Sequence, residues 1–387
     1  MHVKKIIMIA AVSLVDESSG VTQKVISEAK AFHELGASVD CIGYDGNNDV
    51  VLLRDIQGNG AASTQVIGHT RGGKNRRLRL WTKANEHARS NRYDIAYIRY
   101  PSLDPVVLRV LKTLKKTCGH VVMEVQSYPL VFKSHGAVRR AQFEIDRLLQ
   151  KKCGTCLDRV LYMGNRTDRI FGCEAVQIAN GLPDGMRDVE YSGYRLEDGC
   201  INLICVSNMY FVHGYDRLLE GLADYYDQKK PDECDVTVTM VGDGPCREEY
   251  ERIAEERGIR ERVAFKGYLK GDALTQEYRK ATIGVGGLGL YREGLLEASS
   301  LKTKEYLLRG LPFVYAGKET GLDESFPFAM SLPNTEEKID IRQITAFTDR
   351  IREYDPEDVV QYMRSYAEQH FTWRSIFADC CGDYLAE

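Results

Sequence analysis

Two hydrophobic patterns alternate along the first half of the chain. Short apolar runs typical of buried strands occupy residues 4–12, 38–43, 94–99, 120–125, 159–163 and 175–178. Between them, residues 21–35, 75–90, 104–117 and 137–152 carry apolar positions at the spacing of one helix face. This alternation of strands and helices predicts a parallel sheet that is covered by helices on both faces.

The alternation returns in the second half, after a polar run at residues 183–199 that is typical of a linker. Strands are predicted at residues 201–206, 236–241, 263–265, 282–290 and 313–315, and helices at residues 214–226, 245–257, 271–280, 301–309, 336–354 and 356–385. The predicted fold class is α/β, with two doubly wound Rossmann-like domains that face a cleft. Ligands are expected in such clefts.

The start of the helix near residue 300 is the most informative local feature. Ser299 or Ser300 can accept hydrogen bonds from the first free amides, Leu301 begins the apolar face, and Gly310 ends the helix. Lys302 and Lys304 fall in the first turn, next to the positive end of the helix dipole. Two lysines in that place make sense if a phosphate lies between them and the free amides.

Two glutamates flank this helix start. Glu297 precedes the helix and Glu305 lies about one turn inside it, so both carboxylates could face a ligand. One carboxylate could hold the hydroxyls of a sugar and the other a ribose. The alternative is a solvated helix with surface charges. The strand-like run at residues 282–290 favours a ligand site, because ligands bind at the carboxyl ends of parallel strands.

Composition limits the class of protein. The 387 residues fit two or three domains, and 43% hydrophobic with 28% charged residues is typical of a soluble globular protein. A net charge of −4 gives no nucleic-acid signal, and no segment has the uninterrupted apolar length that spans a bilayer. The 11 cysteines lack regular spacing, and Cys153 and Cys156 form a lone CxxC pair. We therefore predict a cytoplasmic protein without a disulfide framework.

Several motifs follow one another in a distinctive order. They are Ser19-Gly20-Val21, Ile178-Ala179-Asn180-Gly181-Leu182, Val241-Gly242-Asp243-Gly244-Pro245, Val263-Ala264-Phe265-Lys266-Gly267-Tyr268, the pair Glu297 and Glu305, Gly310-Leu311-Pro312, and Phe371-Thr372-Trp373. Over nearly its whole length the chain thereby resembles the retaining glycosyltransferases of the GT-B type, specifically the GT4-like group that builds bacterial polysaccharides.

The resemblance implies an organisation and a reaction. It implies an acceptor-side domain at residues 1–185, a linker at 186–200, a nucleotide-sugar-binding domain at 201–360, and a C-terminal helix at 361–387 that returns to the first domain. The implied reaction moves a sugar from a nucleotide diphosphate sugar to a saccharide or lipid-linked acceptor, with retention at the anomeric carbon, in bacterial surface polysaccharide synthesis. No cofactor is expected beyond the donor, which is linked to UDP or GDP.

The resemblance also assigns roles to residues. Glu297 would hold the donor sugar, Glu305 the ribose, and the amides near Ser299, Ser300 and Leu301 the distal phosphate. Further donor contacts are implied for Gly20, Gly242 and Tyr268. No Asp-x-Asp sequence occurs, so amides and cations rather than a metal are expected to stabilise the leaving diphosphate.

In the first domain, relatives place a histidine after the strand that here ends near Gln126. Gln126, Glu124 and Tyr128 are the candidates for acceptor or sugar contacts, and His135 is a weaker one. Structural roles are the alternative for each of them.

The chain departs from the family pattern at one phosphate-binding segment. Where relatives have "G-R-L-x-x-x-K-G", residues 207–214 place Asn208 at the arginine and His213 at the lysine, before Gly214. His213 can donate one hydrogen bond, or carry a charge if a phosphate raises its pKa. Our hypothesis is that diphosphate binding has moved partly onto Lys302, with Lys304 adding charge.

Residues 71–92 form a basic amphipathic segment. It includes Arg76, Arg77, Arg79 and Trp81, and Glu86 is its only acid. The segment could lie on an anionic membrane, which would make the protein peripheral on the inner face of the cell membrane, or it could be a solvated face. Nucleic acid is not expected, because no recognised motif accompanies the segment.

Two other functions remain open from the sequence. The loss of the arginine and the lysine suits a degenerate glycosyltransferase that acts as a partner subunit or a sugar-binding chaperone. A sugar nucleotide epimerase of the GT-B type is the second alternative.

Overall fold

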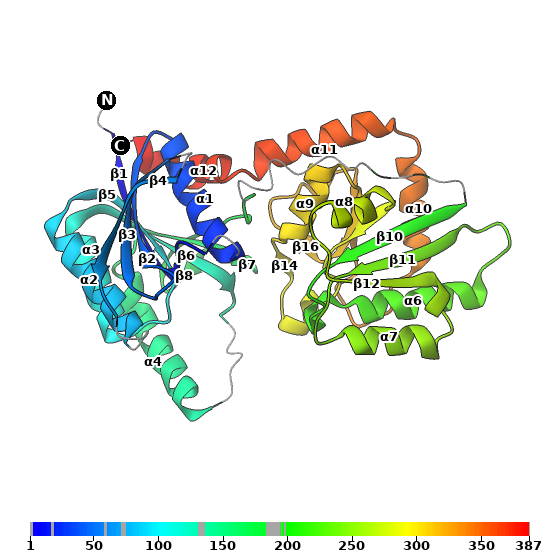
Figure 1. Ribbon diagram of the computed structural model, residues 1–387, viewed down its shortest axis with the longest axis horizontal. Helices are drawn as coiled ribbons and strands as arrows, with labels where there is room; N and C mark the ends of the chain where they lie inside the picture. The colour runs from blue at the N-terminus through cyan, green and yellow to red at the C-terminus, as the bar shows by residue number, and fades with distance from the viewer. Residues whose placement is uncertain are drawn as a thin grey trace. The chain divides into compact units, whose positions relative to one another are not determined.

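The computed structural model describes residues 3–16, 19–57, 60–70, 75–130, 136–182, 194, 196 and 199–386. The chain forms two compact units, each drawn in Figure 1 with its own sheet and helices. The first unit contains residues 1–184 and 372–387, and the second contains residues 185–371. The predicted α/β class is confirmed.

The first unit is built on a nine-stranded sheet in the order β4-β3-β2-β1-β5-β6-β7-β9-β8. Six neighbouring strands, from β2 to β9, pair in parallel, while β3, β4 and β8 pair antiparallel at the edges. The strands are β1 (Lys5–Ser13), β2 (Ser38–Tyr44), β3 (Val50–Gln57), β4 (Gly60–Gly68), β5 (Tyr93–Arg99), β6 (Cys118–Tyr128), β7 (Arg159–Gly164), β8 (Arg169–Ile170) and β9 (Cys173–Gln177).

The central strand β1 explains the continuous apolar run near the start of the chain. Residues 6–10 are all buried, because side chains on both faces of this strand meet covering helices. The helices of the first unit are α1 (Gly20–Glu34), α2 (Arg76–Ser90), α3 (Pro105–Thr117), α4 (Ala137–Gly154) and α12 (Trp373–Ala386). On one face, Ile7 and Ile9 share a core cluster with Trp81 of α2 and Leu111 of α3.

The other face is closed by α1 and by α12, which comes from the far end of the sequence. Phe32 of α1 stacks on Phe377 of α12 with ring centroids 4.1 Å apart. Arg159 binds the Asp383 carboxylate through two hydrogen bonds of 2.9 and 2.8 Å. The first unit is therefore complete only when the last 16 or so residues of the chain have packed onto it.

The second unit has a six-stranded, fully parallel sheet in the order β12-β11-β10-β13-β15-β17. Its strands are β10 (Cys200–Val206), β11 (Asp235–Val241), β12 (Val263–Gly267), β13 (Ile283–Val285), β15 (Phe313–Ala316) and β17 (Ala329–Leu332). Its helices are α6 (Tyr215–Gln228), α7 (Arg247–Glu256), α8 (Gly271–Arg279), α9 (Leu301–Arg309), α10 (Ile341–Ile351) and α11 (Pro356–His370), with short 3-10 helices η1 (Phe211–His213), η2 (Arg260–Arg262) and η3 (Leu290–Glu293).

Two strand features differ from the prediction. The strand expected at residues 282–290 ends at Val285, because the amides from Leu288 on bond to a loop instead of to the sheet: Leu288 N donates to His213 O at 2.8 Å and Gly289 N to Val212 O at 3.2 Å. A small separate sheet also forms from β14 (Glu297–Ala298) and β16 (Lys318–Glu319). The pattern of apolar residues is too short there to predict two-residue strands.

We predict that Gly181→Ala destabilises the first unit by about 1–3 kcal/mol, because an added methyl group overpacks a filled site. A Cβ at Gly181 would lie 2.5 Å from the indole ring of Trp373. Urea unfolding of the full chain measures the change. Gly382→Ala is the control, since Gly382 has open space around it in α12 and alanine favours helices by about 1 kcal/mol. Equal effects of the two changes would contradict the prediction.

Candidate functional site

Three neighbouring strands of the second unit end at one cavity. β10, β13 and β15 lie side by side in the sheet, and the loops after their carboxyl ends line a cavity of about 150 Å³. Open parallel sheets bind ligands at this edge. The lining residues are Val212, His213, Gly287, Leu290, Ala298, Ser300, Lys302, Thr303, Tyr315, Ala316, Lys318 and Glu319.

The amino end of α9 opens onto this cavity. Ser300 is the N-cap residue with extended backbone angles, and its Oγ accepts a hydrogen bond from Lys302 N at 3.2 Å. Leu301 is the first helical residue, as predicted. Because the first amides of a helix lack partners within the helix, this end offers donors and a positive potential to an anion.

Lys302 brings a cation to the same cavity. No described residue forms a hydrogen bond or an ion pair with its amine. Burial lowers the pKa of Lys302 to about 8, against the opposing effect of Cys205 and Glu305. A desolvated amine without a counter-ion is favourably placed for a ligand that carries negative charge.

His213 reaches the cavity as a neutral hydrogen-bond donor. Its Nδ1 accepts a hydrogen bond from Tyr210 N at 2.9 Å, so the proton of the neutral ring lies on Nε2. Burial and the neighbouring charge of Lys302 lower the pKa of His213 to about 3. Of the two roles that the sequence left open for His213, the geometry of the protein without ligand favours donation over charge.

Lys304 does not share the cavity with Lys302. Its side chain is fully buried, pairs with the Glu319 carboxylate, and donates to Ser299 Oγ at 2.8 Å. Glu319 Oε1 also accepts from Ser300 N at 3.0 Å. Burial raises the pKa of the Glu319 carboxyl, while the Lys304 ammonium opposes that rise. The sequence argument that Lys304 neutralises a phosphate is corrected: Lys304 holds the helix start in place.

The two glutamates of the motif lie outside the cavity lining. Glu297 forms β14 and pairs in register with Lys318 of β16. Glu305 is bound to Arg309, whose Nε lies 3.0 Å from Oε1. Arg309 in turn lies 4.0 Å from the ring centroid of Tyr278. The roles of Glu297 and Glu305 toward sugar and ribose stay predictions.

Other predicted donor residues lie at loop ends. Gly214 has a positive φ of 64°, and a Cβ there would lie 2.7 Å from Gly289 N, so this glycine lets two loops approach closely. Gly242 likewise has a positive φ, directly after β11. Asn208 and Tyr268 are exposed, and Gly20 begins α1 in the first unit.

Tyr315 and Lys318 are among the lining residues that escaped the sequence reasoning. Tyr315 is the third residue of β15, and Lys318 follows that strand. Lys318 forms an ion pair of 3.0 Å with Glu324. The rule that ligands bind at strand ends could have found Lys318, since β15 was a predicted strand.

In the first unit, Gln126 lies beside a buried charge cluster. Gln126 Nε2 donates to Glu124 O at 2.9 Å. Glu124 is fully buried, with Lys24 Nζ at 2.5 Å and Arg99 Nη1 at 3.2 Å. Burial raises the pKa of Glu124, but Lys24 and Arg99 outweigh it and the net shift is downward. The carboxylate of Glu124 is thus engaged inside the unit. His135 lies outside the described residues.

The helix α2 differs from the expected membrane helix. Trp81 and Leu80 are fully buried in the core of the first unit, so Trp81 is not a surface anchor. Arg76 donates to Asn48 Oδ1 at 2.6 Å and Arg77 to Asp104 Oδ2 at 3.0 Å. Arg79 donates to His69 O at 3.2 Å. The apolar face of α2 packs inward, because α2 covers the sheet.

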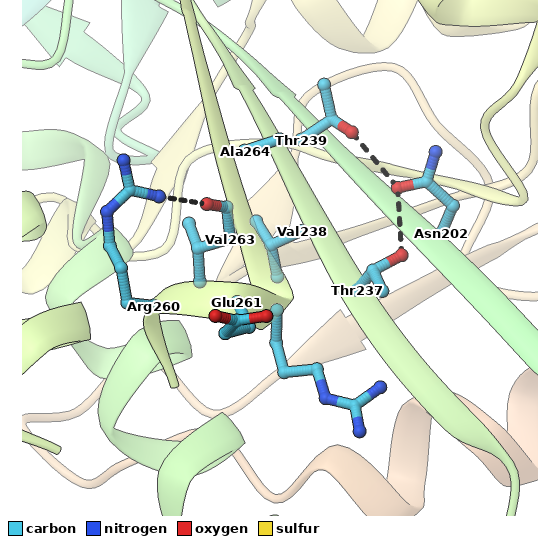
Figure 2. Close-up of a pocket in the computed structure, with 9 residues that line it drawn as sticks. Asn202, Thr237, Val238, Thr239, Arg260, Glu261, Val263 and Ala264 are labelled. Atoms are coloured by element: carbon cyan, nitrogen blue, oxygen red, sulfur yellow. Dashed lines mark hydrogen bonds between the residues drawn. The ribbon is translucent and has the colours of Figure 1, made fainter. Parts of the chain in front are cut away.

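A second pocket of about 650 Å³ lies on the opposite half of the second sheet, toward the amino ends of β10, β11 and β12. Figure 2 shows that several of its polar groups are hydrogen-bonded to other lining residues. Asn202 Oδ1 accepts from Thr237 and Thr239 at 3.4 and 3.2 Å, and Arg260 donates to Val263 O at 2.9 Å. We therefore regard the smaller cavity as the functional site despite its size.

Within the described residues, no three His, Cys, Asp or Glu side chains gather as metal ligands would. In the same residues, no helix is long and apolar enough to cross a membrane.

Residues 200–326 match a family described as glycosyl transferases group 1. The cavity and α9 lie inside the matched residues. The second unit therefore carries a domain of the glycosyl transferases group 1 type. No curated protein matches the chain.

Solved structures resemble the whole chain. Sucrose-phosphate synthase from Thermosynechococcus elongatus is 15% identical with a TM-score of 0.60, and the match covers 98% of each chain. HepE from Anabaena, solved in complex with UDP, is 13% identical with a TM-score of 0.58 over 99% of this chain and 100% of that chain. The catalytic domain of starch synthase IV from Arabidopsis thaliana, bound to ADP and acarbose, is 10% identical with a TM-score of 0.63 over 100% and 99%. The fold is the GT-B fold.

We predict that Lys304→Met destabilises the second unit by about 3–5 kcal/mol, because it leaves the Glu319 carboxyl buried without its cation. Urea unfolding measures the loss. Adding Glu319→Gln should recover part of the stability, since glutamine is neutral and keeps an acceptor for Ser300 N. A double variant that is less stable than Lys304→Met alone would contradict this role of the pair.

Proposed function

We propose that the protein is a retaining, metal-independent glycosyltransferase. It moves a sugar from a nucleotide diphosphate sugar to a saccharide or lipid-linked saccharide acceptor, in bacterial surface polysaccharide synthesis. One observation carries the proposal: the amino end of α9, Lys302 and His213 converge on one cavity inside the residues that match glycosyl transferases group 1. These are the donor types that a diphosphate requires.

The chemistry of the leaving group fits these donors. The bond from the anomeric carbon to the diphosphate oxygen breaks, and a bond from that carbon to the acceptor oxygen forms. The acceptor proton leaves with the departing diphosphate. Charge develops on the diphosphate in the transition state, where fixed amides, Lys302 and the Nε2–H of His213 stabilise it. In this proposal Lys302 replaces the cations that relatives carry at the positions of Asn208 and His213.

Lys318 adds a second cation at the rim of the cavity. It lines the cavity beside Glu319, and its side chain is partly exposed. Its present partner, Glu324, is exposed, so exchanging this partner for a phosphate involves little desolvation. Two cations and one neutral donor would then face the diphosphate without a divalent metal.

The nature of the nucleotide is supported by two of the structural neighbours. HepE was solved with UDP and the starch synthase domain with ADP. Both ligands are nucleoside diphosphates, the product that our reaction releases. In the proposal Tyr268 and Gly242 contact the nucleotide, Glu297 holds the sugar hydroxyls and Glu305 the ribose. Gly20 is a further donor residue in the proposal, and Gln126 is the residue assigned to the acceptor.

A partner subunit without activity is the second candidate, and one observation favours it. No permanent cation stands at the family's arginine and lysine positions, and burial holds His213 neutral. A nucleotide diphosphate would then bind weakly or not at all. Isothermal titration with UDP and GDP separates the candidates, because only the enzyme releases heat with one of these nucleotides.

We predict that Lys302→Ala weakens binding of the preferred nucleoside diphosphate about tenfold or more, because it removes a charge-assisted contact. Binding of the monophosphate should change much less. The pKa of Lys302 is about 8, so the lysine loses its proton as the pH rises through that value. Affinity of the unmodified protein should therefore fall between pH 7 and pH 9, whereas that of Lys302→Ala should stay flat; isothermal titration measures both.

Lys270→Ala is the matched control, since Lys270 is exposed in the second unit and lies outside the cavity lining. Equal weakening of the diphosphate and the monophosphate by Lys302→Ala would reject the phosphate site.

We predict that Glu297→Ala lowers sugar transfer about a hundredfold or more, while nucleoside diphosphate affinity and folding are kept, because the lost contact acts on the sugar. Transfer from a panel of UDP and GDP sugars measures the effect, and Glu293→Ala in η3 is the matched acidic control. If Glu297→Ala transfers sugar as fast as the unmodified protein, Glu297 does not hold the donor sugar. Turnover of a donor without any acceptor, followed by NMR, would instead indicate an epimerase.

A further inference from the structure

The helix α4 of the first unit is attached to its core by few residues. Asp146 and Cys153 are the buried side chains of its described residues. Asp146 accepts from Tyr100 Oη at 2.8 Å and also from the backbone amide of Leu103. Figure 1 shows that the amino-terminal part of α4 extends away from the rest of the first unit. Most of the helix surface is therefore free to meet a partner.

Large apolar side chains lie on the outward side of α4. Leu148 is 72% exposed and Ile145 is 46% exposed. Together with Ala141, which is also exposed, they follow the i, i+4, i+7 spacing of one helix face. This face lies opposite Asp146, so it does not complete the core of the unit.

Basic side chains line one side of this apolar strip: Arg140, Arg147 and Lys151 follow the i, i+7, i+11 spacing of the adjacent face. The exposed cations of α4 are Arg139, Arg140, Arg147, Lys151 and Lys152, and its only exposed acid is Glu144. Glu144 pairs with Arg147 at 3.0 Å. An apolar strip beside a row of cations is the pattern of a helix that lies in the interface of an anionic membrane.

The helix α2 offers a useful contrast. Its apolar residues Leu80 and Trp81 are buried, and Leu78, which is 51% exposed, is its one exposed large apolar side chain. Of these two basic helices, only α4 places two exposed leucine-sized apolar side chains, Ile145 and Leu148, on one face beside exposed cations. The basic segment that stands out in the sequence is thus the weaker membrane candidate of the two.

We propose that α4 is the surface by which the protein docks on an anionic lipid membrane. The cations lie at the headgroups, and Ile145 and Leu148 enter the boundary of the acyl chains. The positive charge of α4 favours an anionic membrane over other partners. A second copy of the chain would bring like charges together, and a nucleic acid would leave Leu148 in water. The inference does not depend on sugar transfer, but it favours a lipid-linked acceptor within the proposed function.

Co-sedimentation with vesicles tests the proposal without any donor or acceptor. The full chain should bind vesicles of phosphatidylcholine with phosphatidylglycerol in equal parts, and bind phosphatidylcholine alone at least about tenfold more weakly. Reversing Arg140, Arg147 and Lys151 to glutamate should lower binding more than about a hundredfold, since each cation near such a surface contributes about fivefold. Leu148→Ser should lower binding about tenfold without changing the net charge.

The matched control reverses three exposed cations of α2, as Arg76→Glu, Arg79→Glu and Arg89→Glu. This α2 variant should lose less vesicle binding, relative to the unmodified protein, than the α4 variant loses. The proposal is overturned if the α4 variant binds as the unmodified protein does, or if the α2 variant loses as much binding. Equal binding to both vesicle types, or preference for duplex DNA over vesicles, would overturn it too. If a triple variant fails to fold, Leu148→Ser alone decides.

Discussion

The buried ion pair of Lys304 and Glu319 is the contact on which the candidate site depends. It ties α9 to β16, and through Ser299 and Ser300 it fixes the residues between Glu297 and the first turn of the helix. An ion pair inside a protein is costly unless further hydrogen bonds satisfy its groups, and here serine groups supply them. Because this pair holds the helix start, the free amides and Lys302 face one fixed cavity.

Desolvation gives the same cavity its chemical character. No residue in the described part of the chain supplies a counter-ion to Lys302, and the amide of Tyr210 holds His213 as a neutral donor. A site of this kind favours an anion, because a negatively charged ligand would neutralise the amine that no described carboxylate pairs with. The arrangement also explains how the chain can lack the arginine and lysine of its relatives and still offer donors to a diphosphate.

The first unit is organised differently. Its buried charges have partners inside the unit, and its proposed function lies on its surface, in binding a membrane. Glu124 is enclosed by Lys24 and Arg99, and α12 seals the unit from the far end of the chain. By contrast, α4 keeps one apolar strip exposed to water beside a row of cations. The two units thus divide the proposed work: the second binds the donor, and the first carries the membrane surface.

By itself, the sequence determined the order of strands and helices, the two α/β halves, and the cap of α9 at either Ser299 or Ser300, since these follow from local periodicity and cap chemistry. It also indicated that Lys302 and His213 belong to one site, through motif order. The tertiary structure alone decided that Lys304 turns to Glu319, and that Trp81 is buried while Leu148 is exposed. Those outcomes depend on which distant segment covers each residue, and an apolar or basic periodicity is the same whether its face meets a core or meets water.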